Sequence, residues 1–159
     1  MVTTLTVTLR PSSPQDSARV IEIWQGAVDA THDFLSAEDR AAIEEEVRGF
    51  LPQAPLMLAV DGDDMPLGFM LVDSRHMEAL FIAPEARGQG VGRLLVEAAL
   101  AERPALTTDV NKQNAQAVGF YERLGFIATG RSELDGQGRA YPIMHMQYKA
   151  LSRLRERVG

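Results

Sequence analysis

The sequence contains no cysteine, which excludes disulfide bonds, thiolate metal sites and a cysteine nucleophile. It also has no apolar run of about 18 residues, the length that a membrane-spanning helix requires, so we expect no membrane partner. The N-terminus lacks the basic segment followed by an apolar one that marks a signal peptide, and we expect a cytoplasmic protein. The composition, 45% apolar and 24% charged in 159 residues, is that of one globular domain, assigned to residues 1–159.

The charges are unevenly distributed along the chain. Residues 1–85 contain 5 Arg or Lys against 15 Asp or Glu, a net charge of −10, whereas residues 86–159 contain 11 against 7, a net charge of +4. An acidic surface disfavours a nucleic-acid partner, and a basic second half suits a phosphorylated ligand. The alternative is that these charges only solvate two faces of the protein.

Hydrophobic periodicity and Gly/Pro breaks predict a mixed α/β fold. Apolar residues at helical spacing lie within 20–28, 41–47, 91–100 and 117–124. Strand-like segments lie at 5–9, 56–60, 67–72, 76–82, 106–110, 126–130 and 142–148. The predicted order is therefore strand, two helices, three strands, helix, strand, helix and two strands, with Pro11 ending the first strand.

A glycine-rich segment joins the strand at 76–82 to the next helix. Gly88, Gly90 and Gly92 alternate with other residues there, and Arg87 and Arg93 flank them. Glycines allow the backbone to approach a ligand closely, and the N–H groups and dipole of a helix start attract an anion. The segment therefore suits a pyrophosphate. Tight packing of helix against strand is the alternative reason for the glycines.

Two familiar phosphate motifs fit this segment poorly. A P-loop would end in Gly-Lys-Ser/Thr, but the chain has Gly92-Arg93-Leu94. A dinucleotide-binding motif requires a third glycine where Arg93 stands. Asp109 does follow at about the sequence separation, roughly 20 residues, at which such a motif has its ribose ligand. A nicotinamide-dependent oxidoreductase is consequently a weak alternative.

Two longer patterns, in this order, resemble the GNAT superfamily of N-acetyltransferases. The first is Arg87-x-x-Gly90-x-Gly92 after an apolar strand, and the second runs from Asn114 through Phe120-Tyr121 to Gly125-Phe126. The resemblance covers nearly the whole chain. It implies a single-domain GNAT-like α/β fold, with a mixed central sheet flanked by helices. It also implies acetyl-CoA as cosubstrate and direct attack by a primary amine, from a protein lysine or a small molecule.

The resemblance assigns acetyl-CoA binding to two parts of the chain. The backbone of Leu80-Phe81-Ile82 would pair with pantetheine and polarise the thioester carbonyl, while these side chains are expected to be ordinary core. Asn114 would help to hold the pantetheine arm, or cap the helix that follows it, or both. The complete cofactor set is Leu80, Phe81, Ile82, Arg87, Gly88, Gln89, Gly90, Val91, Gly92, Arg93 and Asn114.

Tyr121 stands at the position that the family uses for the acid that protonates the departing thiolate. A phenol with a pKa near 10 suits this step. The alternative is a buried tyrosine that packs with Phe120 and Leu124. A CoA-binding sensor without turnover is the main alternative function, and Tyr121 argues against it.

The family places its base on the strand at 76–82. His76 and Glu78 share one face of that strand because side chains alternate with period two. If Glu78 were semi-buried, desolvation would make it a competent base, whereas His76 needs no such help. Both residues are alternatively plain surface residues, and a water chain is a third route for the proton.

The segment between the first two helices is expected to line the acceptor side. His32 and Phe34 would form an apolar wall, with Asp33 attracting a cationic amine, unless the segment is a plain loop. His32, His76 and His145 lack metal-ligand spacing, so we expect no metal. The sequence leaves both a monomer and a homodimer open.

Overall fold

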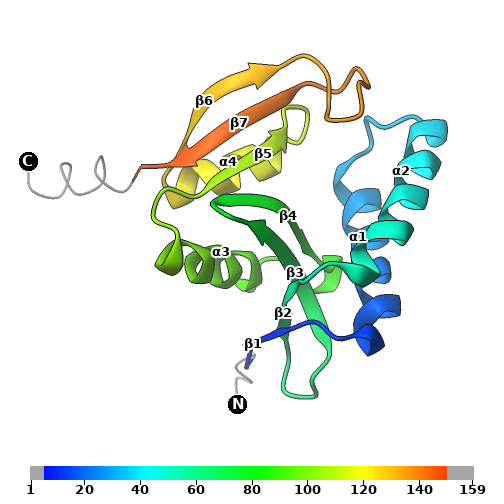
Figure 1. Cartoon of the computed structure of the whole chain (residues 1–159), viewed down its shortest axis with the longest axis vertical. Coiled ribbons are helices and arrows are strands. Elements are labelled where there is room, and N and C mark those ends of the chain that lie inside the picture. Colours follow the sequence, from blue (N-terminus) through cyan, green and yellow to red (C-terminus); the bar gives the residue numbers. More distant parts are fainter. Residues whose placement is uncertain (1–5, 150–159) are drawn as a thin grey trace, which may run out of the picture. The chain divides into compact units, whose positions relative to one another are not determined.

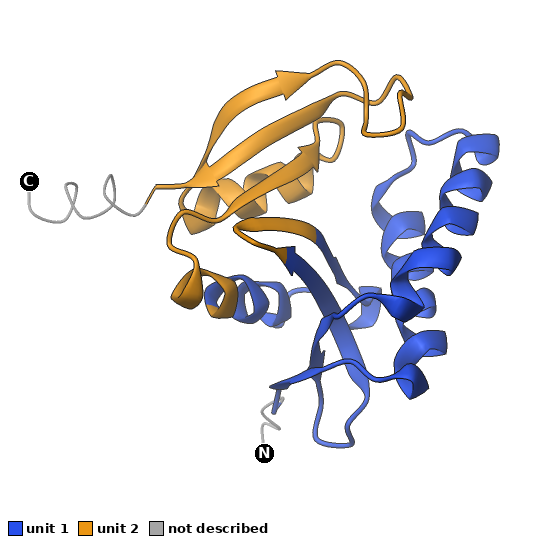
Figure 2. Ribbon diagram, viewed as in Figure 1, with its two compact units in different colours: residues 1–72, 79–97 blue, residues 73–78, 98–159 orange. Residues whose placement is uncertain are grey.

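A computed structural model describes residues 6–149, and these form two compact units (Figure 2). Unit 1 comprises residues 1–72 and 79–97, and unit 2 comprises residues 73–78 and 98–159. The strands are β1 (Thr8–Pro11), β2 (Met57–Val60), β3 (Pro66–Asp73), β4 (His76–Ile82), β5 (Thr107–Asn111), β6 (Phe126–Ser132) and β7 (Ile143–Tyr148). The helices are α1 (Ser17–Thr31), α2 (Ala37–Phe50), α3 (Val91–Glu102) and α4 (Ala115–Leu124), with short 3₁₀ turns at Pro14–Asp16, Leu51–Gln53 and Pro84–Ala86. This order confirms the predicted mixed α/β arrangement (Figure 1).

The sheet has the strand order β1-β2-β3-β4-β5-β7-β6, and β4 contributes residues to both units. In unit 1, β1, β2 and β3 pair in antiparallel fashion, and α1 buries one apolar face against this unit. The buried residues of α1 are Val20, Ile21, Ile23, Trp24, Ala27 and Val28, which confirms its predicted apolar stripe. Ser36 caps α2 as predicted, because its side chain accepts a hydrogen bond from the Asp39 amide (3.1 Å).

Close packing between β3 and β4 in unit 1 requires Gly68. A Cβ atom at this position would lie 2.6 Å from Ile82 Cδ1 and 3.0 Å from Phe81 O, both closer than van der Waals contact. Val91, the first residue of α3, would lie 3.3 Å away through its Cγ1 atom. Gly68 therefore allows the end of β4 and the start of α3 to pack closely on β3.

The first strand differs from the prediction. It includes Pro11, which we expected to end it, and pairs with β2 from Thr8↔Val60 to Pro11↔Met57. Proline is tolerated because β1 lies at the edge of the described sheet, where one side of a strand need not donate backbone hydrogen bonds. Leu5, which we also placed in this strand, lies outside the described residues.

In unit 2, β4 contributes two parallel pairs with β5, namely His76↔Thr107 and Met77↔Thr108. All five residues of β5 pair with β7, which in turn pairs with β6. Helix α4 lies along one face of these strands (Figure 1). The rings of Tyr121, Phe126 and Tyr148 pack edge to face there, with centroid distances of 5.3 and 5.6 Å.

An ion pair anchors the entry to α1. Arg10 donates two hydrogen bonds of 2.9 Å to the buried Asp16 carboxylate, which also accepts from the Ser13 amide (2.8 Å). The Arg10 hydrogen bonds lower the pKa of Asp16 to about 2, although burial alone would raise it. Because the folded pKa is depressed, this stabilisation is present above about pH 4 and lost as the pH falls toward 2.

Asp16→Asn should therefore lower the free energy of unfolding at pH 7 by about 2 kcal/mol. The difference from wild type should shrink as the pH falls from about 4 toward 2, which chemical denaturation at several pH values measures. Asp64→Asn is the matched control, because Asp64 pairs with the same arginine but its side chain is 70% exposed. A loss that stays constant down to pH 2 would contradict the assigned ion pair.

Candidate functional site

The glycine-rich loop of unit 1 has the backbone that the sequence predicts for an anion site. Gly88 and Gly90 have φ angles of +78° and +81°, which side chains other than hydrogen rarely allow. A Cβ atom at either position would meet no heavy atom within 4 Å, so the two glycines border open space rather than a packed interface. This observation disfavours tight packing as the reason for these two glycines.

The first turn of α3 has amides without an acceptor inside the helix. The Leu94 amide donates to Gly90 O at 3.0 Å, which closes the first helical turn. The amides that precede Leu94 in this turn have no acceptor within the helix, and the turn contains no acidic residue. The local field at Val91 and Gly92 therefore favours an anion.

The flanking side chains differ in how they are held. Arg93 is paired with Glu97 (2.7 Å) and points into solvent, with 68% of its side chain exposed. Gln89 makes a long hydrogen bond to Glu85 O (3.4 Å), and Arg87 is half-buried. The charge-assisted phosphate contacts expected of Arg93 would first require it to leave Glu97.

Leu80, Phe81 and Ile82 are half-buried, not fully buried as ordinary core residues would be. The Phe81 ring lies 5.6 Å from the Phe69 ring within unit 1. Our expectation that these three side chains are core is thus only partly met.

In unit 2, Asn114 is the N-cap of α4. Its side-chain oxygen accepts a hydrogen bond from the Ala117 amide at 3.2 Å. Gly125 ends the same helix in the left-handed conformation, with φ of +112°, as expected for a glycine after the last turn. The capping role predicted for Asn114 is therefore present in the structure.

Tyr121 lies on the buried face of α4, with only 6% of the residue exposed. Its ring packs against Phe120 and Phe126 at 5.1 and 5.3 Å. Burial raises the pKa of Tyr121 well above its ordinary value, and a hydrogen bond with Thr108 lowers it only partly. The phenol is therefore neutral throughout the physiological range.

The two candidate bases differ in their surroundings. Glu78 is exposed. It therefore lacks the partial burial that we expected of a carboxylate acting as the base. His76 is half-buried, and its Nδ1 lies 2.7 Å from Thr107 Oγ1. Its Nε2 lies 3.5 Å from Asp109 Oδ2.

Asp109 also contacts a second imidazole that we had set aside. His145 Nδ1 lies 2.6 Å from Asp109 Oδ1, and His145 Nε2 lies 2.7 Å from Ser132 Oγ. We considered Asp109 only as a ribose ligand and His145 only as a metal ligand, so this group was missed. Period-two alternation together with the antiparallel pair Asp109↔His145 would have found it.

The segment between α1 and α2 belongs to unit 1. His32 is the C-cap of α1, its ring lies 5.2 Å from the Phe34 ring, and its Nδ1 lies 2.7 Å from Thr31 Oγ1. Burial lowers the pKa of His32, which keeps its imidazole neutral at pH 7. Asp33 is exposed.

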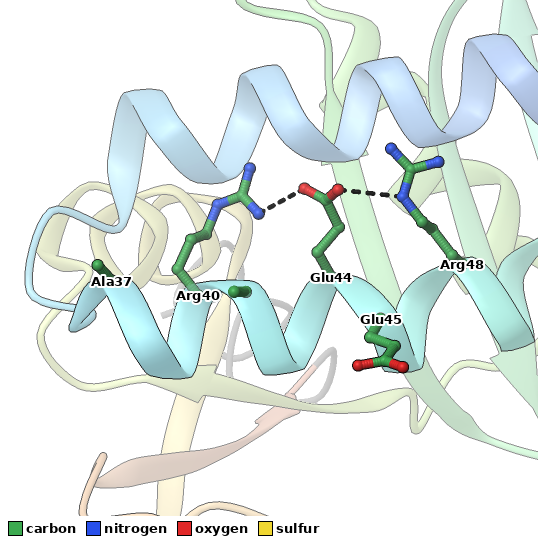
Figure 3. Close-up of a pocket in the computed structure, with 6 residues that line it drawn as sticks. Ala37, Arg40, Glu44, Glu45 and Arg48 are labelled. Carbon is green, nitrogen blue, oxygen red and sulfur yellow. Dashed lines mark hydrogen bonds and ion pairs between the residues drawn. The ribbon is translucent and has the colours of Figure 1, made fainter.

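A shallow hollow of about 370 Å³ lies along α2 and contains none of the predicted site residues. Figure 3 shows that Glu44 lies between Arg40 and Arg48 and pairs with both, so the hollow presents balanced charge.

Among residues 6–149, no group of three or more His, Asp or Glu side chains could hold a metal ion. No helix in this range has the length and apolarity to cross a membrane.

Comparison with known proteins identifies the relatives of this chain. A family model described as the acetyltransferase (GNAT) domain matches residues 25–149. The chain is 54% identical over 144 residues to the peptidyl-lysine N-acetyltransferase YjaB of Escherichia coli K12, covering 91% of this chain and 98% of the relative.

Solved structures agree with this assignment. The apo form of YjaB from Escherichia coli matches with a TM-score of 0.87 at 54% identity, over 90% of this chain and 97% of YjaB. The PaiA N-acetyltransferase of Thermoplasma acidophilum, solved in complex with coenzyme A, has a TM-score of 0.72 at 19% identity, over 90% of this chain and 99% of PaiA. The latter likeness concerns the fold alone. The chain therefore belongs to the GNAT family of acetyltransferases.

Proposed function

We propose that this protein transfers the acetyl group of acetyl-CoA to the side-chain amine of lysine residues in proteins. The observation that carries this proposal is its 54% identity, across nearly the whole of both chains, to a peptidyl-lysine N-acetyltransferase. The glycine-rich loop supports acetyl-CoA as the donor, because Gly88 and Gly90 border open space and the helix that follows begins without an acidic residue.

The residues assigned to acetyl-CoA divide between phosphate and thioester recognition. The amides of 87–93 would hold the pyrophosphate, and their glycines permit the close approach that it needs. The backbone of Leu80–Ile82 would pair with the pantetheine arm, and Asn114 would contact it while it caps α4. The thioester supplies an activated acetyl group, and the chain orients it and controls the protons.

Proton control requires both an acid and a base. Tyr121 is the proposed acid, because burial keeps its phenol protonated and therefore able to protonate a departing thiolate. Loss of this acid at high pH should begin only above the ordinary tyrosine range, since a raised pKa shifts deprotonation to more alkaline pH. His76 and Glu78 are the proposed candidates for the base.

His32 and Phe34 are the proposed acceptor-side residues. The neutral imidazole and the adjacent ring provide an apolar surface for the lysine methylenes. The acidic character of residues 1–85 would attract a cationic acceptor over a longer range.

A peptide acetylation assay tests the activity itself. Purified protein, acetyl-CoA and lysine peptides should release free CoA thiol, and mass spectrometry should locate the acetyl group on the lysine side chain. Polyamines and free lysine serve as competing acceptors. Binding of acetyl-CoA without thiol release for any amine would instead support a CoA-binding module.

Gly90→Ala should weaken acetyl-CoA binding about tenfold by calorimetry, since alanine at a φ of +81° strains the loop. Gly62→Ala is the matched control, because Gly62 also borders open space but has no positive φ angle. Equal affinities for both variants and wild type would remove the loop from the phosphate site.

Tyr121→Phe should lower kcat by roughly 10²- to 10⁴-fold while acetyl-CoA affinity stays within about twofold of wild type. The ring packing is retained and only the hydroxyl is lost. Tyr148→Phe, which also removes a hydroxyl from the aromatic cluster of unit 2, should leave kcat unchanged. If Tyr121→Phe retains full turnover, packing is the only role of this residue.

Asn114→Ser should separate capping from ligand binding. Serine caps helices almost as well as asparagine, so thermal stability should change little, whereas Asn114→Ala should cost about 1 kcal/mol. Acetyl-CoA affinity should fall in both variants if the amide contacts pantetheine. Unchanged affinity in Asn114→Ser would leave Asn114 as a cap alone.

A further inference from the structure

A chain of hydrogen-bonding side chains crosses one face of the unit 2 strands. It runs from Ser132 on β6 through His145 on β7 and Asp109 on β5 to His76 on β4, and we call it the imidazole–carboxylate chain. Thr107 continues it beyond His76. Helix α4 lies along one face of these strands (Figure 1), and Thr108 on β5 bonds to its Tyr121 there. Thr107 and Asp109, the neighbours of Thr108, therefore lie on the other face.

The His145 end of the chain fixes the orientation of Asp109. An ionised carboxylate only accepts hydrogen bonds, so His145 Nδ1, 2.6 Å from Asp109 Oδ1, must carry a hydrogen and donate it. In the neutral imidazole, Nε2 then accepts from the Ser132 hydroxyl at 2.7 Å. With Oδ1 engaged in this way, the second oxygen, Oδ2, faces His76.

The His76 end of the chain has the opposite requirement. Thr107 Oγ1 lies 2.7 Å from His76 Nδ1 and 3.3 Å from Arg75 O, and we assign its single hydrogen to Arg75 O, so that it accepts at His76 Nδ1. Neutral His76 therefore carries its hydrogen on Nδ1 and a lone pair on Nε2. That lone pair and Asp109 Oδ2 are two acceptors 3.5 Å apart with no hydrogen between them.

Two facing acceptors require a donor, and solvent can reach them. The side chains of His76 and Asp109 are 29% and 44% exposed. Exposed ion pairs contribute only about 0 to 1 kcal/mol, so folding stability gives little reason for this arrangement. A primary ammonium group has three N–H donors and a positive charge, which match one carboxylate oxygen and one imidazole lone pair.

We propose that the ammonium group of the acceptor lysine binds between Asp109 Oδ2 and His76 Nε2, and that His76 Nε2 takes its proton. This inference rests on the proposed function. One ammonium N–H bond breaks and the Nε2–H bond forms, which leaves an imidazolium beside the Asp109 carboxylate. The amine lone pair then attacks the thioester carbonyl, the C–S bond breaks, and the thiolate receives the Tyr121 proton. The nitrogen of the new amide releases its second proton to solvent, and solvent returns a proton to the Tyr121 phenolate.

The assignment separates catalytic from positioning residues. His76 and Asp109 contact the ammonium, whereas His145 and Ser132 act through Asp109 by holding its Oδ1. The titratable side chains that alternation places on this face of the unit 2 strands are His76 and Glu78 on β4, Asp109 on β5 and His145 on β7. Glu78 is exposed and takes no part in the imidazole–carboxylate chain, so His76 is the base.

Nitrogen NMR of the histidine side chains tests the binding site without requiring turnover. Neutral His76 and His145 should both show the Nδ1–H tautomer. Addition of Nα-acetyl-lysine-methylamide should shift the His76 Nε2 signal in wild type and not in Asp109→Asn. An Nε2–H tautomer for neutral His76, or a shift that persists in Asp109→Asn, would overturn the proposal.

Kinetics on a lysine peptide then test the proton transfer. His76→Gln should lower kcat by about 10²- to 10⁴-fold and abolish the ascending limb of the pH profile. Asp109→Asn should raise KM for the peptide about 10- to 100-fold, because the ammonium group loses its anionic partner. His145→Gln should also raise KM for the peptide, but by a smaller factor. Asp109→Glu should restore part of the affinity that Asp109→Asn loses, because glutamate keeps the carboxylate.

Glu133→Gln is the matched control, because it removes an exposed unit 2 carboxylate that pairs with Arg131. It should leave all kinetic constants unchanged. Loss of the ascending limb in Glu78→Gln but not in His76→Gln would overturn the inference and leave the proposed function intact. Wild-type protein that transfers acetyl to no amine would contradict the proposed function, while the NMR experiment would still decide whether an ammonium binds here.

Discussion

The two residue pairs between β4 and β5 determine where the proposed catalytic groups of unit 2 lie. The pairs His76↔Thr107 and Met77↔Thr108 place successive residues on opposite faces of the strands. Thr108 and Met77 are buried, and Thr108 bonds to Tyr121 on the α4 face. A slip of one residue would move His76 to the buried face, so this short register is a precondition for the chemistry.

Local sequence signals predicted most of the fold. Apolar periodicity gave the helices, and the glycines that end α4 and shape the loop before α3 have the positive φ angles that such positions require. Proline usually ends a strand, and we predicted that Pro11 does so. That prediction was wrong, because β1 is an edge strand, where a proline can be accommodated. Edge position is a property of the whole sheet, which no local pattern contains.

Proposed site residues within one segment could be inferred from the sequence, whereas side chains that several strands bring together were missed. The loop at 87–93 and the candidates on β4 follow from motifs, but Asp109 and His145 meet only through β5–β7 pairing across 36 residues. Burial was also unpredictable from pattern alone, since Glu78 is exposed and Phe81 only half-buried. Side-chain exposure depends on what the rest of the chain places above each face.

Strand β5 separates the proposed acid from the proposed base. Thr108 contacts Tyr121 on the face that α4 covers, whereas the next residue, Asp109, contacts His76 on the other face. Burial on the α4 face keeps the Tyr121 phenol protonated, whereas His76 and Asp109 on the other face are partly exposed. The alternation of side chains along this one strand therefore places the proposed acid and the proposed base on opposite faces.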